Sequence, residues 1–139
     1  MPLPFETALV TGGASGLGRA TARHLAGLGA RVVVLDLNAE RAEQTAAEFG
    51  GIGIGADVGD PEAVAEAFAA ATQALGAAPR IVVNCAGIGT AARILPRDGG
   101  LPIAEFERTL RINLIGTYSV LSHAAQGMST LEPLADGAR

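Results

Sequence analysis

Four glycines, at positions 12, 13, 16 and 18, follow a short apolar run near the start of the chain. The run Ala8–Val10 has the character of a strand, and residues 17–28 recur with helical spacing. A strand–turn–helix pattern of this kind points the free N–H groups of the helix at an anion, and glycine allows a phosphate to approach closely. The spacing, Gly-x-x-x-Gly-x-Gly from Gly12, predicts a phosphate-binding turn. A glycine-rich turn that holds no ligand is the alternative.

An acidic residue, Asp36, ends the next apolar run, 20 residues after Gly16. At this place a carboxylate accepts hydrogen bonds from the hydroxyls of an adenine ribose and repels a 2′-phosphate. Leu37 and Asn38 follow, where an NADP site usually offers a basic residue. The pattern therefore favours NAD over NADP. A turn or helix-capping aspartate is the alternative.

Three further groups of residues follow predicted strands or lie on a predicted helix, so we expect them at the same edge of the sheet as the glycine turn and Asp36. Asp57 follows a third short run and offers its carboxylate to the adenine amino group, while Val58 offers a backbone N–H. Residues 84–87, Asn-Cys-Ala-Gly, carry small side chains where a ribose passes close to the backbone. Asn113 lies on the apolar stripe of a helix, so we expect a buried amide with partners. Taken singly, Asp57 is typical of a turn and Asn113 of a satisfied core asparagine.

The elements that must position these residues alternate strictly between strand and helix. This alternation predicts an α/β fold of the Rossmann type: a doubly wound parallel sheet in three α/β/α layers, with strand order 3-2-1-4 and ligands at the carboxyl ends of the strands. We expect residues 1–139 to form one domain that stops after the fourth strand and its helix. The long loop 88–102 is typical of a functional segment. The expected strands are 5–10, 31–36, 52–56 and 80–83, and the expected helices are 17–28, 38–49, 61–75 and 103–126.

Composition narrows the class of protein. Hydrophobic residues make up 49% of the 139 residues, which excludes a disordered chain, and the net charge of −4 without a basic run argues against nucleic acid as a partner. No apolar run approaches 18 residues, and the first strand leaves no room for a signal peptide, so we expect no membrane contact and a cytoplasmic location. Cys85 is the only cysteine, and no metal site is expected.

Taken together, the glycine turn with Thr11, Asp36, Asp57-Val58, residues 84–87 and Asn113 resemble the short-chain dehydrogenase/reductase family in order and spacing. The family's usual Asn-Asn-Ala-Gly has Cys85 in its second place here. That cysteine, the loop 87–92 and the segment 106–118 are most similar to the type-2 3-hydroxyacyl-CoA dehydrogenases, also called 17β-hydroxysteroid dehydrogenase type 10. The resemblance covers nearly the whole chain.

The resemblance implies NAD-dependent hydride transfer between the nicotinamide and a secondary alcohol or ketone, with a 3-hydroxyacyl-CoA or a hydroxysteroid as substrate. It implies that Ser15 and Leu17 contact the pyrophosphate and nicotinamide side and that Cys85 and Gly87 contact the neighbouring ribose. Relatives are commonly tetramers, so a homo-oligomer is expected, with the helix 103–126 at the contact. The implied catalytic residue is Asn113, which orients a water in the proton relay, and the implied cofactor-binding residues are Gly12, Ser15, Gly16, Leu17, Gly18, Asp36, Leu37, Asp57, Val58, Asn84, Cys85, Ala86 and Gly87.

The sequence departs from the family in its acid–base residues. Family members carry a serine and then Tyr-x-x-x-Lys, in which the lysine lowers the pKa of the tyrosine so that it acts as a base. Here all ten basic residues are arginine, and the one tyrosine, Tyr118, is followed by Ser-Val-Leu-Ser. We therefore expect the N-terminal, cofactor-binding portion of a longer enzyme, inactive by itself. A dinucleotide-binding module without chemistry and a degenerate scaffold with an empty loop are the alternatives.

Overall fold

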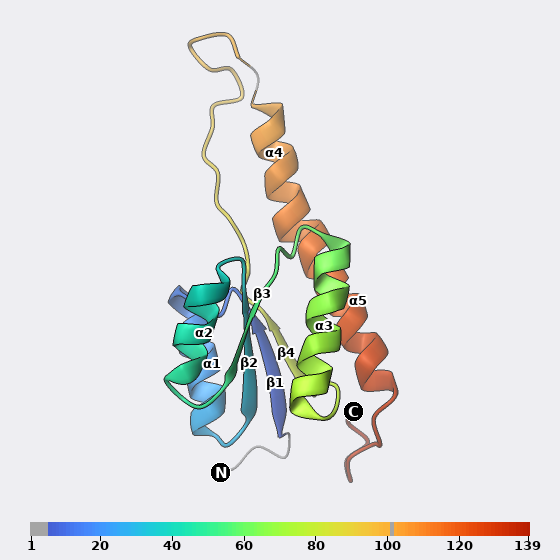
Figure 1. Ribbon diagram of the computed structural model, residues 1–139. Coiled ribbons are helices and arrows are strands. Elements are labelled where there is room, and N and C mark those ends of the chain that lie inside the picture. Colours follow the sequence, from blue (N-terminus) through green and yellow to red (C-terminus); the bar gives the residue numbers. More distant parts are fainter. Residues whose placement is uncertain (1–5, 101) are drawn as a thin grey trace.

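The protein is built on a four-stranded parallel sheet with the order β3-β2-β1-β4 (Figure 1). The computed structural model describes residues 6–100 and 102–139. The strands are β1 Thr7–Thr11, β2 Arg31–Asp36, β3 Ile52–Gly55 and β4 Ile81–Asn84. The predicted fold class and strand order are confirmed, and the expected start of β1 at Phe5 lies outside the described residues.

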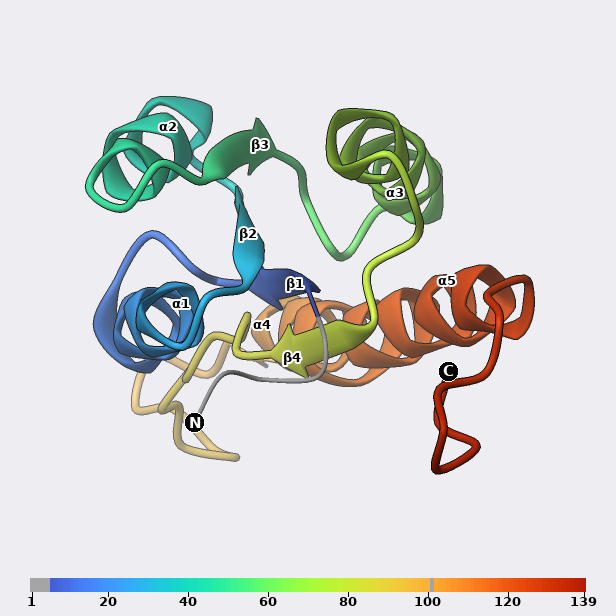
Figure 2. The ribbon, with the colours of Figure 1, turned by 90° about the horizontal axis from the view of Figure 1, so that it is seen from below.

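Helices cover both faces of the sheet and make the three predicted layers (Figure 2). The crossover helices α1 Gly16–Gly27 and α2 Ala39–Ala47 lie on one face. On the other face lie α3 Pro61–Leu75 and a long helical rod that ends in α5 Thr117–Ser129. Because each parallel strand needs a crossover, this arrangement brings all four strand ends to one edge of the sheet.

The two central strands are buried on both faces, because helices cover both sides of the parallel sheet. Alternate residues of β1 and β2 point to opposite sides: Leu9 and Val33 pack with α3 and α5, whereas Val10 and Val34 pack with α1 and α2. These four side chains are fully buried. Two apolar cores, one on each side, therefore fix the sheet beneath the strand ends.

Local capping sets where two of the helices begin. Asn38 accepts a hydrogen bond from the N–H of Arg41 at the start of α2, and Asp60 accepts one from the N–H of Glu62 at the start of α3. Pro61 occupies the first helical position, where its missing N–H costs nothing. Both starts agree with the sequence within a residue.

One pair of basic residues ties the first two helices together at the surface. Arg19 and Arg23 of α1 both pair with Glu48 after α2. Hydrogen bonds from Arg23 and Arg19 hold the pKa of the Glu48 carboxyl below its usual value. In the part of the chain that the structure describes, no other side chains form an ion pair within 4.0 Å.

The last helical rod differs most from its prediction. It is a continuous run of three segments, α4 Ile103–Leu110, a π-helical segment Arg111–Gly116 and α5, and it ends at Ser129 rather than at residue 126. Together with the segment 88–100, α4 extends beyond the strand ends (Figure 1). The expected apolar stripe 103–124 is buried only in α5, at Val120 and Ala124. In α4 it is exposed, with Phe106 at 62%, because no described part of the chain covers the projecting end of the rod.

Two features of the outer surface complete the fold. β4 pairs with β1 on one side, and among the described residues no strand pairs with its other side. Along residues 6–100 and 102–139, no helix combines the length and the apolar character needed to cross a membrane.

Candidate functional site

The glycine turn after β1 requires glycine for two different reasons. Gly12 and Gly16 adopt the left-handed φ values of 61° and 52° that favour glycine. Gly18 packs against the turn itself: a Cβ on Gly18 would lie 2.1 Å from the carbonyl oxygen of Gly12. A Cβ on Gly16, by contrast, would meet nothing within 4 Å. The turn is thus tight inside and open on the side that faces the strand ends.

The N-terminus of α1 is the one crossover-helix start that no side chain caps. Ser15 occupies its N-cap position without a side-chain hydrogen bond, and the first turn contains no acidic residue. The helices α2 and α3, in contrast, are capped by Asn38 and Asp60. The first N–H groups of a helix seek an acceptor and carry a partial positive charge. The start of α1 is therefore suited to an anion.

Asp36 stands at the end of β2 and is tied to the same turn. Its Oδ2 accepts a hydrogen bond of 3.1 Å from the N–H of Ala14, and its Oδ1 accepts one of 3.2 Å from the N–H of Asn38. An ionised carboxylate offers about four acceptor sites, so each oxygen keeps one for a ligand. The two backbone donors hold the half-buried carboxylate in position beside the glycine turn.

Asp57 and Val58 follow β3 at the next strand end. The Asp57 Oδ1 accepts a 2.8 Å hydrogen bond from the N–H of Gly59, which fixes the turn into α3. No hydrogen bond to the Val58 N–H occurs within the described residues. The Asp57 Oδ2 atom and the Val58 N–H, which belong to consecutive residues, therefore offer a hydrogen-bond acceptor and a hydrogen-bond donor to a ligand.

The residues after β4 are held by a buried hydroxyl from β1. The Thr11 Oγ1 accepts hydrogen bonds from the N–H of Cys85 (3.2 Å) and of Ala86 (3.1 Å). Thr11 is fully buried, and the backbone of Ala86 approaches Gly12 so closely that a Cβ on Gly12 would lie 2.8 Å from it. The ends of β1 and β4 therefore form one rigid floor.

Asn113 joins the π-helical segment to the loop after β4. Its Oδ1 accepts a 2.8 Å hydrogen bond from the N–H of Ile88, and its Nδ2 donates a 2.8 Å hydrogen bond to the Ile88 carbonyl. The Thr117 hydroxyl donates to the Asn113 carbonyl, also at 2.8 Å. The expected partners exist, but the expected burial is wrong: Asn113 is exposed, because the rod projects past the sheet at this point. Its orientation is fixed by the two opposite backbone groups.

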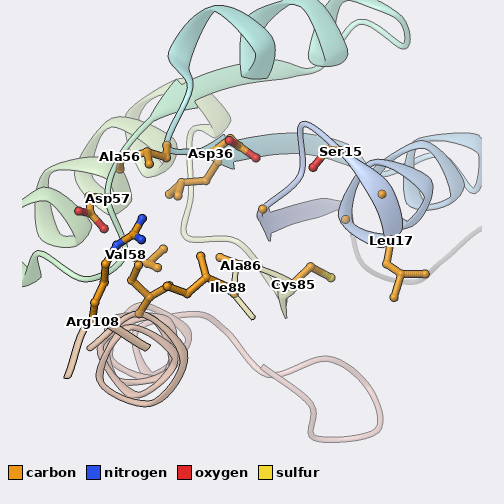
Figure 3. Close-up of a pocket in the computed structure, with 17 residues that line it drawn as sticks. Ser15, Leu17, Asp36, Ala56, Asp57, Val58, Cys85, Ala86, Ile88 and Arg108 are labelled. Atoms are coloured by element: carbon orange, nitrogen blue, oxygen red, sulfur yellow. The ribbon is translucent and has the colours of Figure 1, made fainter. Parts of the chain in front are cut away.

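A cavity of about 410 Å³ lies over the strand ends and collects most of the residues named above (Figure 3). Asn84 and Asn113 are the two predicted site residues that do not line it. Asn84 is exposed at the end of the edge strand, and Asn113 contributes through its bonds to Ile88. The predicted residues that line the cavity are Gly12, Ser15, Gly16, Leu17, Gly18, Asp36, Leu37, Asp57, Val58, Cys85, Ala86 and Gly87.

Five residues that line the cavity were not predicted from the sequence: Leu35, Ala56, Ile88, Arg108 and Ile112. The first three are chain neighbours of predicted residues. Arg108 and Ile112 come from the rod, where the spacing i, i+4 places them on one face. Asn113 lies five residues after Arg108 and one after Ile112, so helical spacing counted back from Asn113 reaches Thr109 and Leu110 and does not find them.

Comparison with known proteins assigns the chain to a family. The family model described as short chain dehydrogenase matches residues 6–133. A 3-hydroxyacyl-CoA dehydrogenase type-2 from Drosophila melanogaster is 38% identical over 135 residues, covering 94% of this chain and 52% of that protein. The protein of the same name from Homo sapiens is 39% identical over 136 residues, covering 95% and 52%.

Two further relatives carry other names. A D-threitol dehydrogenase from Mycolicibacterium smegmatis is 42% identical over 121 residues, covering 84% of this chain and 45% of that protein. A crystal structure described as ribose-5-phosphate isomerase from Brucella melitensis 16M superimposes with a TM-score of 0.80 at 36% identity, covering 93% of this chain and 49% of that one. The chain spans about half the length of the curated relatives it matches.

Proposed function

The chain belongs to the short chain dehydrogenase family, and we propose that it binds NAD as the N-terminal, cofactor-binding portion of an oxidoreductase. The observation that carries the proposal is the placement of the uncapped start of α1 and the Asp36 carboxylate on one cavity. The first suits a pyrophosphate and the second suits the hydroxyls of a ribose. A dinucleotide presents both groups next to each other.

The residues around Asp36 favour NAD over NADP. Both Asp36 oxygens already accept from backbone N–H groups, and the remaining acceptor sites match the two hydroxyls of a ribose. A 2′-phosphate would set a second negative charge against this carboxylate. Leu37 and Asn38, which follow, offer no cation. Repulsion without compensation disfavours NADP.

The other strand ends serve the rest of the dinucleotide. Asp57 and Val58 present an acceptor and a donor that match the edge of adenine, and the backbone at Cys85 and Gly87 leaves room for the second ribose. When bound, the nicotinamide supplies the hydride acceptor or donor for a secondary alcohol or ketone. Asn113 retains one amide N–H and one oxygen lone pair beyond its bonds to Ile88, and these suffice to orient a water.

For the whole protein we also propose a substrate class, an oligomeric assembly and a location. We propose a 3-hydroxyacyl-CoA as substrate, which the names of the relatives called 3-hydroxyacyl-CoA dehydrogenase type-2 support. A hydroxysteroid, which the resemblance implies, is the second proposed substrate. A similar identity to a D-threitol dehydrogenase means that this half does not by itself separate these substrates. We propose that the protein assembles as a homo-oligomer, since large apolar side chains are exposed along the rod. We also propose a cytoplasmic location.

The alternative function is a dinucleotide-binding module that performs no chemistry. The absence of lysine from these 139 residues favours it for the chain taken alone, because a Tyr-x-x-x-Lys pair cannot be formed. Both functions require the same cavity to bind the cofactor. They differ in whether a substrate is turned over when the acid–base residues are supplied.

Titration of the purified chain with NADH and with NADPH tests the proposal. Binding of NADH at least tenfold tighter than NADPH, a difference of about 1.4 kcal/mol, is expected. Calorimetry reports both affinities directly. Failure to bind either dinucleotide would overturn the proposed function, and equal affinities would overturn the preference for NAD.

A further inference from the structure

Arg108 is the one basic residue that lines the cavity, and neither the sequence motifs nor the resemblance gives it a role. It extends from the last turn of α4, with the acidic residues Asp36 and Asp57 among the other lining residues. The ion pairs among the described residues involve only Arg19, Arg23 and Glu48, so no described carboxylate lies within 4.0 Å of the Arg108 guanidinium. Its charge is therefore available to a ligand.

The helix packing places Arg108 at the end of the cavity formed by β3. A Cβ on Gly116 would lie 2.9 Å from the carbonyl oxygen of Val58, and a Cβ on Gly59 would lie 3.5 Å from the Cγ1 of Ile112. The rod thus runs along the Asp57–Gly59 turn, and Arg108 stands one turn beyond Ile112. Figure 3 shows Arg108 at the same end as Asp57 and Val58 and away from Ser15 and Leu17. Arg108 therefore lies at the end of the cavity opposite to the expected pyrophosphate site.

Two ordinary explanations for the residue do not account for this position. An arginine near the C-terminus of a helix is often favoured by the helix dipole. Here the rod continues, and the N–H of Arg111 already bonds to the carbonyls of Arg108 and Glu107. Arg108 is exposed, yet its side chain lines the cavity instead of extending away from it. The guanidinium is planar and binds aromatic faces better than an ammonium does.

We infer that Arg108 covers the adenine ring of the bound dinucleotide, stacking its guanidinium on the base whose edge meets Asp57 and Val58. This inference rests on the proposed function, because it requires a dinucleotide in the cavity. Ile112, on the same face of the rod, supplies the apolar neighbour of the stack. Arg108 is therefore a binding residue that raises the affinity for a ligand with an aromatic base at this end of the cavity, relative to a ligand that lacks the base.

Calorimetric titration of the full 139-residue chain with ADP-ribose tests this role. Arg108→Ala is expected to bind ADP-ribose about fivefold more weakly than the unsubstituted chain. Arg108→Lys keeps the charge but not the plane, so it should recover less than half of the lost binding free energy. Arg111→Ala, on the same rod but outside the cavity lining, removes the same charge and should stay within twofold. Circular dichroism melts check that each variant folds.

Salt separates stacking from a phosphate contact. The ratio of affinities between the unsubstituted chain and Arg108→Ala should be the same at 50 and 300 mM NaCl, since a stacked contact is only weakly screened, whereas a phosphate contact weakens. An unchanged affinity in Arg108→Ala, full recovery in Arg108→Lys, or a ratio that collapses with salt would each overturn the inference and leave the proposed function standing. Failure of the unsubstituted chain to bind ADP-ribose would overturn both.

Discussion

Replacing Asp36 by asparagine tests the basis of cofactor choice with the least change of shape. In Asp36→Asn, the amide oxygen of the new side chain can still accept one of the two backbone N–H groups, from Ala14 or Asn38, that the carboxylate accepts now. The negative charge is lost, and an NH₂ group replaces one acceptor. We expect the preference for NADH over NADPH to fall from at least tenfold to about threefold or less.

The magnitude follows from the position of the carboxylate. Asp36 is half-buried, so its field acts largely through water. A charge of −1 facing a 2′-phosphate of −2 at about 6 Å costs about 1.4 kcal/mol at the dielectric constant of water, which is a factor of about ten. Removing the charge removes this term. NADH should lose part of its ribose hydrogen bonding at the same time, so the two affinities converge from both sides.

Calorimetric titration with NADH and NADPH measures both affinities in each variant. Asp60→Asn is the matched control, because it removes one carboxylate charge at a helix start outside the cavity and asparagine caps a helix equally well. Both affinities of this control should stay within twofold of the unsubstituted chain. An Asp36→Asn chain that keeps its full preference for NADH would refute the electrostatic reasoning.

Further predictions concern the floor of the cavity, the turn, turnover and assembly. Thr11→Val leaves the Ala86 N–H without its acceptor and should lower the free energy of unfolding by about 1–3 kcal/mol in urea titrations, whereas Thr11→Ser, which keeps the hydroxyl, should lose less; equal losses would contradict the role of the hydroxyl. Gly18→Ala, with a Cβ 2.1 Å from the Gly12 oxygen, should cost about 1–3 kcal/mol and weaken NADH binding, whereas Gly27→Ala, which meets open space, should do neither. The 139-residue chain saturated with NAD should form no NADH from a 3-hydroxyacyl-CoA, since general acid–base catalysis contributes about 10²- to 10⁴-fold; robust turnover would disprove this. Light scattering after size exclusion should show self-association through the apolar rod, and a monodisperse monomer would count against it.

The sheet and its connections followed from the sequence because their causes are local. Strand periodicity, the caps Asn38 and Asp60, and the glycine turn each act within a few residues, and the right-handed crossover rule turns their order into one topology. Parallel strands must end at one edge, so Asp36, Asp57 and Cys85 were predicted to meet without any knowledge of packing. The structure places all three on one cavity.

The long rod could be predicted from the sequence only in part. The sequence predicted that residues 103–126 form a helix. It did not predict how far the helix projects past the sheet or which of its apolar residues are exposed. Those depend on Gly116 packing against Val58 and on the π-helical turn that brings Asn113 to Ile88. Such contacts join residues far apart in the chain, and no periodicity reports them.

The family pattern, that is, the order of strands and helices and the residue types at the strand ends, can be predicted from the sequence. Which side chains close the cavity depends on how the helices pack on the sheet. Arg108 reaches it from a helix that the sequence places 50 residues beyond Val58, and the Thr11 hydroxyl holds Ala86 across 75 residues. The physical reason is that strand and turn preferences act between neighbours along the chain, whereas the walls of a cavity are set by packing between elements that meet only once the chain has folded.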